Sequence, residues 1–292
     1  MYQASSDKKI QIPCKDALVW EESDVKAFFP ARESDAHKGI FGKACILTYG
    51  ARVGAAMLSA AACLRSGVGY TTLRVPYELR PYVATALPAC IVEGFTALDE
   101  EILSYHALAL GMGSGIRKEL YALITQLLKN YRGTLVLDAD ALNVLSEYGL
   151  KSLKSKSCQV ILTPHLKEFS RLCGKTVKEV FDGGEALAKA FAKEYGVTLV
   201  LKSNHTIVTD GERTVINTTG SPALAKAGSG DVLSGLMVGT CARRLSPFDA
   251  ACVSCYVFGR AGEEAEREFG QYAPTASDII SLLPRVIKNL EC

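Results

Sequence analysis

The chain has 292 residues, of which 48% are hydrophobic and 22% are charged. This composition is typical of a globular protein with a large core, and the formal net charge of +2 is too small to indicate nucleic acid or an anionic membrane as a partner. No apolar run approaches a membrane span, and the first residues lack the apolar core of a secretory signal. We therefore expect a cytoplasmic protein with a flexible tail at residues 1–15 and one domain over residues 16–292.

The 10 cysteines are scattered through apolar segments and do not follow the spacing of a disulfide framework. Cys252 and Cys255 are the only close pair, and they lie within a helical pattern with no second pair to complete a zinc site. The sequence therefore predicts buried thiols that pack in the core.

Strand and helix patterns alternate along the first half of the chain. Strands are predicted at residues 44–48, 70–75, 89–93, 107–110 and 134–137, and helices at residues 21–28, 54–65 and 117–130. Glycine turns follow the strands at 44–48 and 107–110, which is where open α/β sheets usually bind ligands. Such turns are weak indications by themselves, because a tight turn needs glycine with or without a ligand.

The second half continues the alternation and adds a hairpin. Strands are predicted at residues 160–162 and 198–202, hairpin strands at 207–209 and 214–216, and helices at 184–195, 231–243, 246–269 and from 277 onward, with a kink at Pro284. The whole pattern predicts an α/β fold in which a mainly parallel sheet lies between two helical layers.

Two acidic residues follow the strand at residues 134–137. Asp138 and Asp140 stand at the carboxyl end of a strand, where carboxylates are suited to hold Mg²⁺ or its waters. Asp140 could equally cap the helix that begins there, and the sequence leaves both roles open.

A second polar loop follows residues 160–162 and reads TPHLKE. Thr163 is expected to cap the next helix, and Pro164 suits its first position. His165 and Glu168 are three residues apart, so they lie on one face of the first turn and both could reach the same cleft. The alternative is a solvated His165 with Glu168 as the far half of a capping box.

The stretch that organises the chain, residues 217–239, contains Gly228, Ser229, Gly230 and Asp231 directly before an apolar pattern at helical spacing. A glycine loop that opens into a helix is an anion site, because glycine lets the backbone approach a phosphate and the first helical amides have no internal partners. Asp231 either caps this helix or takes a proton from an attacking hydroxyl, and these residues favour the two roles equally.

Motifs occur along nearly the whole chain, from residue 24 to residue 290. They read HKG at 37–39, GAA with LRSGVGY at 54–70, GMGSG at 111–115, DADALN at 138–143, LTPHLKEF at 162–169, LKSNHT at 201–206 and NTTGSPALAKAGSGDVLSG at 217–235. In this order they resemble the ADP- or ATP-dependent NAD(P)H-hydrate dehydratases of the ribokinase-like superfamily. GSGD marks the wider superfamily, whereas DADALN and TPH with the downstream Glu are narrower. The resemblance implies a ribokinase-like three-layer α/β/α sandwich.

The resemblance also implies a repair reaction. The substrates are NADHX and NADPHX, reduced dinucleotides that have added water at the nicotinamide ring. Because hydroxide leaves poorly, the ring hydroxyl is first phosphorylated by ADP or ATP with Mg²⁺, and phosphate then leaves to restore NAD(P)H. The alternative is a kinase that phosphorylates a small alcohol, such as a vitamin precursor or sugar, because the same base and anion site would serve it.

Roles for individual residues follow from the resemblance. It implies that Asp231 is the catalytic base and that Ala55, Gly113 and His165, together with Asp231, bind the hydrated dinucleotide. It implies that Glu168 and Asp138 arrange Mg²⁺. The residues that it implies for the adenine nucleotide are Lys202, Ser203, Asn204, His205, Thr206, Gly228, Ser229 and Gly230.

The sequence departs from the family pattern at three places. Ser203 stands where the family commonly has glycine, the first loop reads TYGARVGAA, and Lys226-Ala227 replaces a frequent Thr-Gly pair. These changes bear on substrate details and nucleotide preference, for which we expect ADP. Relatives are often tetramers or other homo-oligomers. Many also carry an epimerase domain for which this chain is too short, so a separate NAD(P)H-hydrate epimerase is an expected functional partner.

Overall fold

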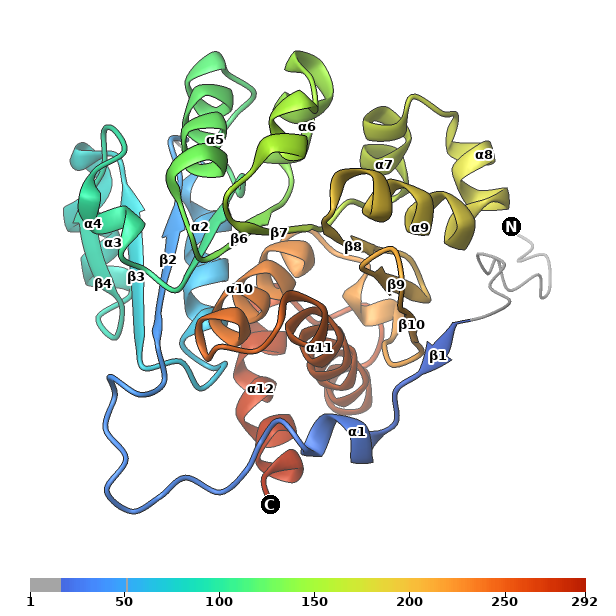
Figure 1. Ribbon diagram of the computed structural model, residues 1–292. Helices are drawn as coiled ribbons and strands as arrows, with labels where there is room; N and C mark the ends of the chain where they lie inside the picture. The colour runs from blue at the N-terminus through green and yellow to red at the C-terminus, as the bar shows by residue number, and fades with distance from the viewer. Residues whose placement is uncertain (1–16, 51) are drawn as a thin grey trace, which may run out of the picture.

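A 10-stranded, mainly parallel sheet runs through the residues that the computed structural model describes, 17–50 and 52–292 (Figure 1). The strands lie in the order β1-β10-β9-β8-β7-β6-β5-β2-β3-β4, and only β9 runs antiparallel to both of its neighbours. Their bounds are β1 Leu18–Val19, β2 Lys43–Leu47, β3 Tyr70–Val75, β4 Ile91–Gly94, β5 Ala107–Leu110, β6 Thr134–Leu137, β7 Gln159–Leu162, β8 Thr198–Leu201, β9 Thr206–Thr209 and β10 Thr214–Asn217.

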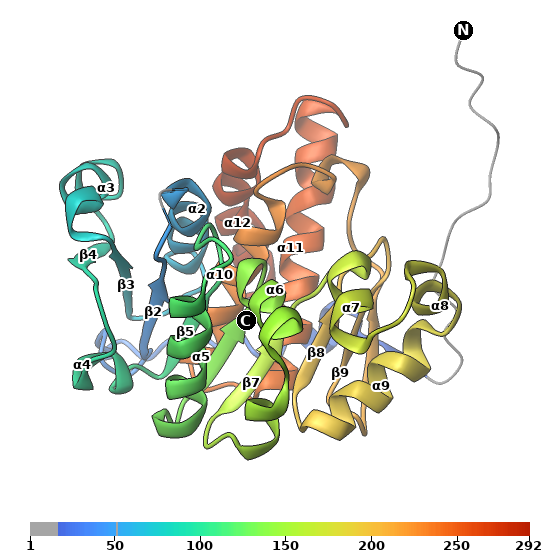
Figure 2. The same ribbon diagram turned by 90° about the horizontal axis from the view of Figure 1, so that it is seen from above.

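Helices cover both faces of the sheet (Figure 2). One face carries α2 Val53–Cys63, α10 Ser229–Ala242, α11 Pro247–Phe269 and α12 Ala276–Leu290. The other carries α5 Lys118–Asn130, α6 Asp140–Tyr148, α7 Leu166–Cys173, α8 Val177–Asp182 and α9 Gly184–Tyr195. The remaining helices are α1 Glu22–Lys26, α3 Arg80–Ala86 and α4 Glu100–Leu103. Within the described residues, none of these helices combines the length and apolar character that a membrane span needs.

Each face of the sheet has its own apolar core. Along β2, Ile46 packs toward α2 and α10, whereas the next residue, Leu47, packs toward α5 and α6. Successive side chains of a strand point to opposite faces, so a strand that is covered on both faces reads as an unbroken apolar run. This double burial explains the runs ALAL and TLVL in β5 and β6.

The helices α2 and α10 pack backbone to backbone. A Cβ atom built on Gly235 of α10 would lie 2.0 Å from the carbonyl oxygen of Ser59 in α2, so only glycine fits there. Ala56 and Ala60 of α2 are fully buried, and their small side chains permit the same close approach. The start of α10 is therefore held beside the start of α2.

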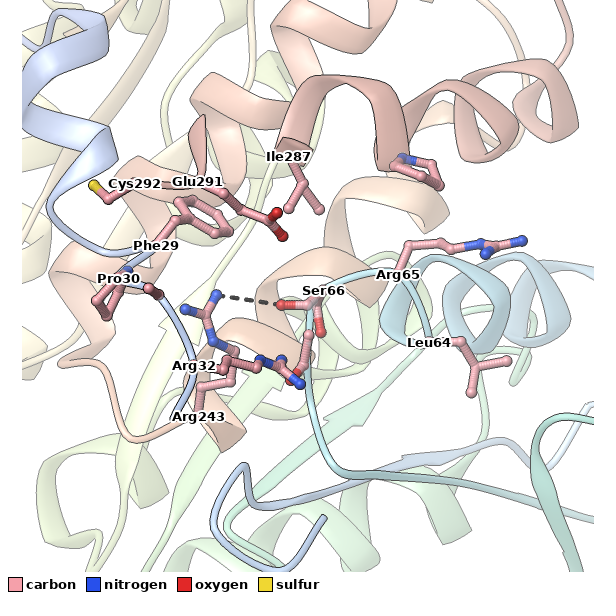
Figure 3. A pocket seen from close by; sticks show the side chains of 13 residues that line it. Phe29, Pro30, Arg32, Leu64, Arg65, Ser66, Arg243, Ile287, Glu291 and Cys292 are labelled. Atoms are coloured by element: carbon pink, nitrogen blue, oxygen red, sulfur yellow. Dashed lines mark hydrogen bonds between the residues drawn. The ribbon is translucent and has the colours of Figure 1, made fainter. Parts of the chain in front are cut away.

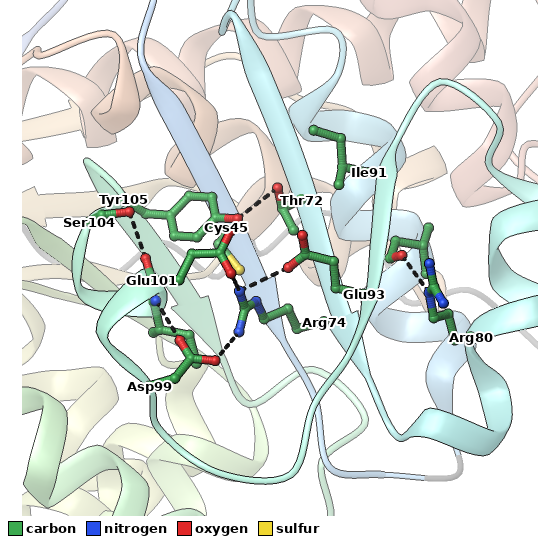
Figure 4. Close-up of polar contacts among 12 residues, drawn as sticks. Cys45, Thr72, Arg74, Arg80, Ile91, Glu93, Asp99, Glu101, Ser104 and Tyr105 are labelled. Carbon is green, nitrogen blue, oxygen red and sulfur yellow. Dashed lines mark hydrogen bonds and ion pairs between the residues drawn. The ribbon is translucent and has the colours of Figure 1, made fainter.

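A buried arginine ties the edge of the sheet together (Figure 4). Arg74 on β3 forms ion pairs with Glu93 of β4 at 2.9 Å, and with Asp99 and Glu101 at 2.5 Å each. Its side chain is 4% exposed, so the three carboxylates supply the charge that compensates its burial. The cluster fastens β4 and the α4 segment to β3.

Most predicted elements are confirmed, and the structure adds several short ones. The strands at residues 70–75, 107–110 and 134–137 have the predicted bounds, whereas β1, α3, α4 and α8 were not predicted. Cys252 and Cys255 are buried in the core as free thiols, as expected. Pro284 lies inside α12, which continues to Leu290, and a kink there stays a prediction. The prediction for residues 1–15 falls outside the described residues.

Candidate active site

Three polar loops at the carboxyl ends of neighbouring strands meet the amino end of α10. Asp138 follows β6, His165 follows β7, and Lys202 follows β8. His165 and Lys202 pair as an isolated parallel bridge, which extends the contact between β7 and β8 beyond the strands themselves. Parallel neighbours end at one edge of a sheet, so residues far apart in the chain reach one place.

The amino end of α10 is open to an anion. Gly228 stands before the helix with φ of +93°, and Ser229 is the first helical residue. No side chain caps α10, and the amides of Gly230 and Asp231 have no hydrogen-bond acceptor within the part of the chain that the structure describes. A Cβ atom on Gly230 would lie 3.5 Å from Lys202 Nζ. Free amides, the helix dipole and an ammonium group thus converge where a phosphate fits.

Asp231 is therefore not the helix cap that the sequence allowed as one of two roles. It is the third residue of α10, and its carbonyl oxygen accepts a hydrogen bond of 2.8 Å from Ser59 Oγ of α2. Burial, reinforced by the charges of Asp138 and Asp140, raises the pKa of Asp231 to about 6, although Lys202 opposes the increase. A carboxylate with this pKa is ionised at neutral pH and is a stronger base than an ordinary aspartate.

Asp138 and Lys202 form a buried ion pair. Lys202 Nζ donates to Asp138 Oδ1 at 2.8 Å, and Ser234 Oγ donates to Asp138 Oδ2 at 2.7 Å. Burial by itself would raise the pKa of Asp138, but the charge and hydrogen bonds of Lys202 and Ser234 outweigh it, and the pKa is lowered. Burial likewise opposes the charge on Lys202, yet Asp138 and Glu168 raise its pKa. Both members of the pair are charged at neutral pH.

Asp140 holds the glycine loop after β5. Its Oδ2 accepts a hydrogen bond of 2.7 Å from the amide of Gly115, so it does not cap α6. The residue before it, Ala139, has φ of +49°, a backbone conformation that a residue with a side chain rarely adopts. This strained residue turns the chain between Asp138 and Asp140, and such strain is typical of functional sites.

Ala55 and Gly113 lie together at the amino end of α2. A Cβ atom on Gly113 would lie 2.1 Å from the carbonyl oxygen of Arg52 and 3.4 Å from Ala55 Cβ. Ser59 Oγ links this region to α10, because it contacts the carbonyl oxygens of both Ala55 and Asp231.

His165 and Glu168 form a capping box at the start of α7. His165 Nδ1 accepts from the amides of Lys167 and Glu168 at 3.1 Å each, and Glu168 Oε2 accepts from the His165 amide at 2.9 Å. The predicted cap at Thr163 and helix start at Pro164 are thus wrong, since α7 begins at Leu166.

The same contacts determine the protonation of His165. Burial, together with the charge of Lys202, lowers the pKa of His165, so the ring is neutral at neutral pH. Because Nδ1 accepts hydrogen bonds from amides, the ring proton is on Nε2. Half of the side chain is exposed, and Nε2 remains a donor for a ligand.

A cavity of about 740 Å³ adjoins this group of residues. It lies between the loop after β8, the start of α10 and the middle of α11, and its size is suited to a nucleotide. Its polar lining includes His165, Lys202, Ser203, Asn204, Thr206, Ser229 and Gly230, and its apolar lining includes Leu224, Leu233 and Phe258.

Comparison with known proteins assigns the chain to a family. Residues 46–285 match the family model for NAD(P)H-hydrate dehydratase. The chain is also 34% identical to the ADP-dependent (S)-NAD(P)H-hydrate dehydratase of Cenarchaeum symbiosum, over 92% of this chain and 96% of that protein. The chain belongs to the NAD(P)H-hydrate dehydratase family.

Two further dehydratase-family proteins give the context. The bifunctional NAD(P)H-hydrate repair enzyme Nnr of Moorella thermoacetica is 34% identical over 90% of this chain, which spans only 52% of that longer protein. The crystal structure of an ADP/ATP-dependent NAD(P)H-hydrate dehydratase from Bacillus subtilis, co-crystallized with ATP/Mg²⁺, superposes with a TM-score of 0.85 and 28% identity, over 95% of this chain and 100% of that chain. The expected ribokinase-like α/β/α fold is thereby confirmed.

The residues that the dehydratase resemblance implied fall into two groups. Most of the implied nucleotide residues line the 740 Å³ cavity, but His205 and Gly228 do not. Asp231, Asp138 and Glu168 also lie outside its lining, and Gly230, the neighbour of Asp231, is part of it. Ala55 and Gly113 form the second group outside the cavity, beside the starts of α2 and α10. His165 lines the cavity although the resemblance implied it for the dinucleotide. The roles of all these residues stay predictions.

The implied Mg²⁺ fits one of its two predicted ligands better than the other. Glu168 engages the His165 amide through Oε2, while Oε1 lies 3.5 Å from His165 Nε2 and could hold a metal-bound water. Both oxygens of Asp138 already accept hydrogen bonds from side chains. Mg²⁺ usually binds through one or two carboxylates together with phosphate oxygens, so a site at Glu168 agrees with the coordination that Mg²⁺ prefers. The metal role of Asp138 stays a prediction.

Sequence reasoning missed three features of the site. Lys202 was identified only as a nucleotide residue, and its pairing with Asp138 was not foreseen; Ser234 was not identified at all. The strain at Ala139 was also missed, since alanine carries no sign of a positive φ. Ser234 stands three residues after Asp231, so the helical period could have placed it near the same face.

Proposed function

We propose that this protein dehydrates hydrated NADH and NADPH in a reaction that consumes ADP or ATP. The observation that supports it best is the position of Asp231, a carboxylate with a raised pKa at an open helix start, beside Lys202 and next to a cavity of about 740 Å³. The family of the chain supports the same substrates.

In the proposed reaction, Asp231 takes the proton from the hydroxyl on the hydrated nicotinamide ring while that oxygen attacks the terminal phosphoryl group of the nucleotide. The amides of Gly230 and Asp231 then donate to the phosphoryl oxygens, and Lys202 neutralises part of their charge. The phosphate group of the new ester then leaves as inorganic phosphate while the adjacent ring carbon loses a proton, so the ring regains its double bond. The products are NAD(P)H, phosphate and AMP from ADP, or ADP from ATP.

Mg²⁺ bound near Glu168 would supply charge neutralisation to the phosphates. Burial raises the pKa of Glu168, but the charge of Lys202 and the His165 amide favour its ionised form. His165 presents Nε2 as a donor beside the cavity and would orient a phosphate or ribose oxygen there.

Asp231→Asn tests the catalytic role directly. This change keeps the size of the side chain but removes the base, so we expect turnover to fall by at least about a hundredfold while nucleotide binding stays within a few-fold. The assay incubates the protein with hydrated NADH, Mg²⁺ and ADP or ATP, and follows both the absorbance of reduced nicotinamide and the release of phosphate.

Asp249→Asn is the matched control, because Asp249 is the third residue of α11, the same position that Asp231 holds in α10. It should keep full activity. Retained turnover in Asp231→Asn would refute the role of the base. Stable phosphorylation of an added small alcohol, without recovery of NADH, would instead identify a kinase of that alcohol.

Three further properties follow from the family and are proposed with the reaction. We propose a homo-oligomer, cooperation with a separate NAD(P)H-hydrate epimerase, and a preference for ADP. We also propose that residues 16–292 act as one domain, because a single sheet joins strands from both halves of the chain. Assays with ADP and ATP in parallel, together with light scattering of the purified chain, test the preference and the oligomer.

A further inference from the structure

A second cavity, of about 640 Å³, lies at the opposite ends of the two helices that form the active site (Figure 3). Ala55 and Asp231 stand near the amino ends of α2 and α10, whereas Leu64 and Arg243 end these helices and line the second cavity. Its size is close to that of the active-site cavity and suits a small metabolite. The lining residues are Phe29, Pro30, Ala31, Arg32, Leu64, Arg65, Ser66, Gly67, Arg243, Pro284, Ile287, Glu291 and Cys292.

Two guanidinium groups meet on one wall of this cavity. Arg243 donates to the carbonyl oxygens of Ser66 at 3.2 Å and Phe28 at 2.5 Å, and Arg32 donates to the carbonyl oxygen of Gly67 at 2.6 Å. An atom at the Cβ position of Gly67 would lie 2.9 Å from Arg32 Nη2 and 3.8 Å from Arg243 Nε. Burial, and then the charge of Arg32, lower the pKa of Arg243, which shows that the two positive charges repel each other.

Within the described residues, Arg32, Arg65 and Arg243 form no ion pair, whereas Arg285 of the neighbouring α12 pairs with Glu264 and Glu268. Glu291 is the one acidic side chain in the lining, so the side chains of the three arginines outnumber it. Figure 3 shows the Glu291 side chain on the wall opposite Arg32 and Arg243, with Arg65 extending along the rim.

The guanidinium groups are also held in place. Arg32 lies over the ring of Phe41 at 3.7 Å from its centre, and Arg243 lies over the ring of Phe29 at 4.9 Å. Each guanidinium has more N–H donors than its bonds to carbonyl oxygens use. The planar guanidinium group presents parallel N–H donors that are suited to phosphate oxygens. Because both arginine side chains are already held in place, they lose little conformational freedom when a phosphate binds.

We propose that this cavity binds a small organic phosphate. The phosphate group lies against Arg32 and Arg243, and the organic part packs on Phe29, Leu64 and Ile287. A phosphate monoester carries about −1.5 to −2 charges at neutral pH, so the two adjacent guanidinium groups attract it more strongly than they attract a carboxylate, which carries one charge. The site is separate from Asp231 and Lys202, so it goes beyond the proposed reaction and does not depend on it.

The test titrates the full chain with phenyl phosphate and with benzoate by calorimetry. The two probes share an aromatic ring and differ in the charge and shape of the anion. We expect phenyl phosphate to bind at least about tenfold more tightly than benzoate, because the phosphate dianion binds the two guanidinium groups. Equal affinity of the two probes would overturn the phosphate assignment, and so would the absence of phenyl phosphate binding.

Variants locate the site, since the active-site cavity could also take a phosphate. Arg32→Gln keeps a donor for the Gly67 carbonyl and should weaken phenyl phosphate binding about tenfold. Arg285→Gln removes the same charge from α12 outside the cavity and should change binding by less than about twofold. Equal affinities of the two variants would overturn the proposal. If Arg32→Gln does not fold, Arg32→Lys replaces it, because it keeps the charge but removes the planar fork. Binding unchanged in that variant would likewise overturn the proposal.

Discussion

At the residue scale, neighbouring groups shift the pKa of the Asp231 carboxylate in opposite directions. Burial and two neighbouring acidic residues raise the pKa of Asp231, while Lys202 stabilises its ionised form. A base is most effective when its pKa lies near the working pH, because it is then mostly ionised and still binds a proton well. The same environment that tunes Asp231 also makes its charge unfavourable in the folded protein.

The pH dependence of the reaction should report this residue. We expect the rate at limiting substrate to fall as the pH decreases through about 6, because Asp231 is protonated below its pKa. The measurement is kcat/KM for the dehydration across the acid range. A rate that stays constant down to about pH 4 would show that the base has an ordinary aspartate pKa.

The pH dependence of the free energy of unfolding is a second test of the raised pKa of Asp231. A raised pKa means that ionised Asp231 destabilises the folded state at every pH above its ordinary pKa of 3.8, and most fully above about 6. Asp231→Asn should therefore stabilise the protein at pH 7, by about 3 kcal/mol at most, and this gain should vanish as the pH falls below 4. Denaturant unfolding at both pH values measures it. Asp249→Asn should show no such gain.

The pair of Asp138 and Lys202 should behave as a unit. Either Asp138→Asn or Lys202→Met leaves one buried charge without its partner, so we expect each to destabilise the fold by about 3 to 5 kcal/mol. The double variant removes both charges and should cost much less than the sum. Equilibrium unfolding of the four proteins gives the coupling energy. Additive losses would mean that the ion pair contributes nothing.

At the scale of elements, the contact between α2 and α10 positions Asp231, the proposed base. Ser59 of α2 donates to the carbonyl oxygen of Asp231, and Gly235 one turn further along α10 allows the two backbones to touch. Because α2 also carries Ala55, this one contact places a proposed substrate residue and the proposed base relative to each other. A small change in the distance between the helices would displace both.

Gly235→Ala tests this contact. The added methyl group would lie 2.0 Å from the carbonyl oxygen of Ser59, which is backbone and cannot rotate away, so the helices must separate. We expect a loss of about 1 to 3 kcal/mol in the free energy of unfolding, together with reduced turnover. Gly54→Ala in α2 is the control for stability. Its added methyl group meets no atom within 4 Å, so it should stabilise the helix slightly.

At the scale of the whole molecule, the active-site cavity joins parts of the chain that lie far apart. The loop after β8, the start of α10 and the middle of α11 all contribute to it, and a nucleotide would bridge them. A ligand that binds only the folded state raises its stability by mass action, by about 2.7 kcal/mol at a hundredfold excess over Kd. Unfolding of the protein should therefore report nucleotide binding.

We expect ADP at that excess to raise the Tm by roughly 5 to 10 °C. Adenosine at the same concentration should raise it much less, because it lacks the phosphates that the open end of α10 and Lys202 would hold. Differential scanning calorimetry makes the comparison. Equal shifts would show that the open end of α10 does not bind phosphate.

The sequence predicted the elements well and some of their boundaries poorly. Buried strands such as β3, β5 and β6 were located correctly because an apolar run between turn residues is a local signal. The starts of α7 and α10 were misplaced by two residues each. At α7, His165 takes the cap position through its ring nitrogen, although Ser, Thr, Asp and Asn are the usual caps. At α10, no side chain caps the helix at all, so no local signal marks its first residue.

By itself, the sequence determined which chemical groups follow which strand, because a motif such as GSGD or TPH is a property of neighbouring residues. It thereby identified the family and predicted the residues on which the proposed reaction depends. The tertiary structure decided what each group does to the others. Lys202 lies 64 residues from Asp138 yet neutralises it, and the pKa of Asp231 follows from charges and burial that only the folded chain creates. Electrostatic effects depend on distance and on the exclusion of water, and neither can be read along a chain.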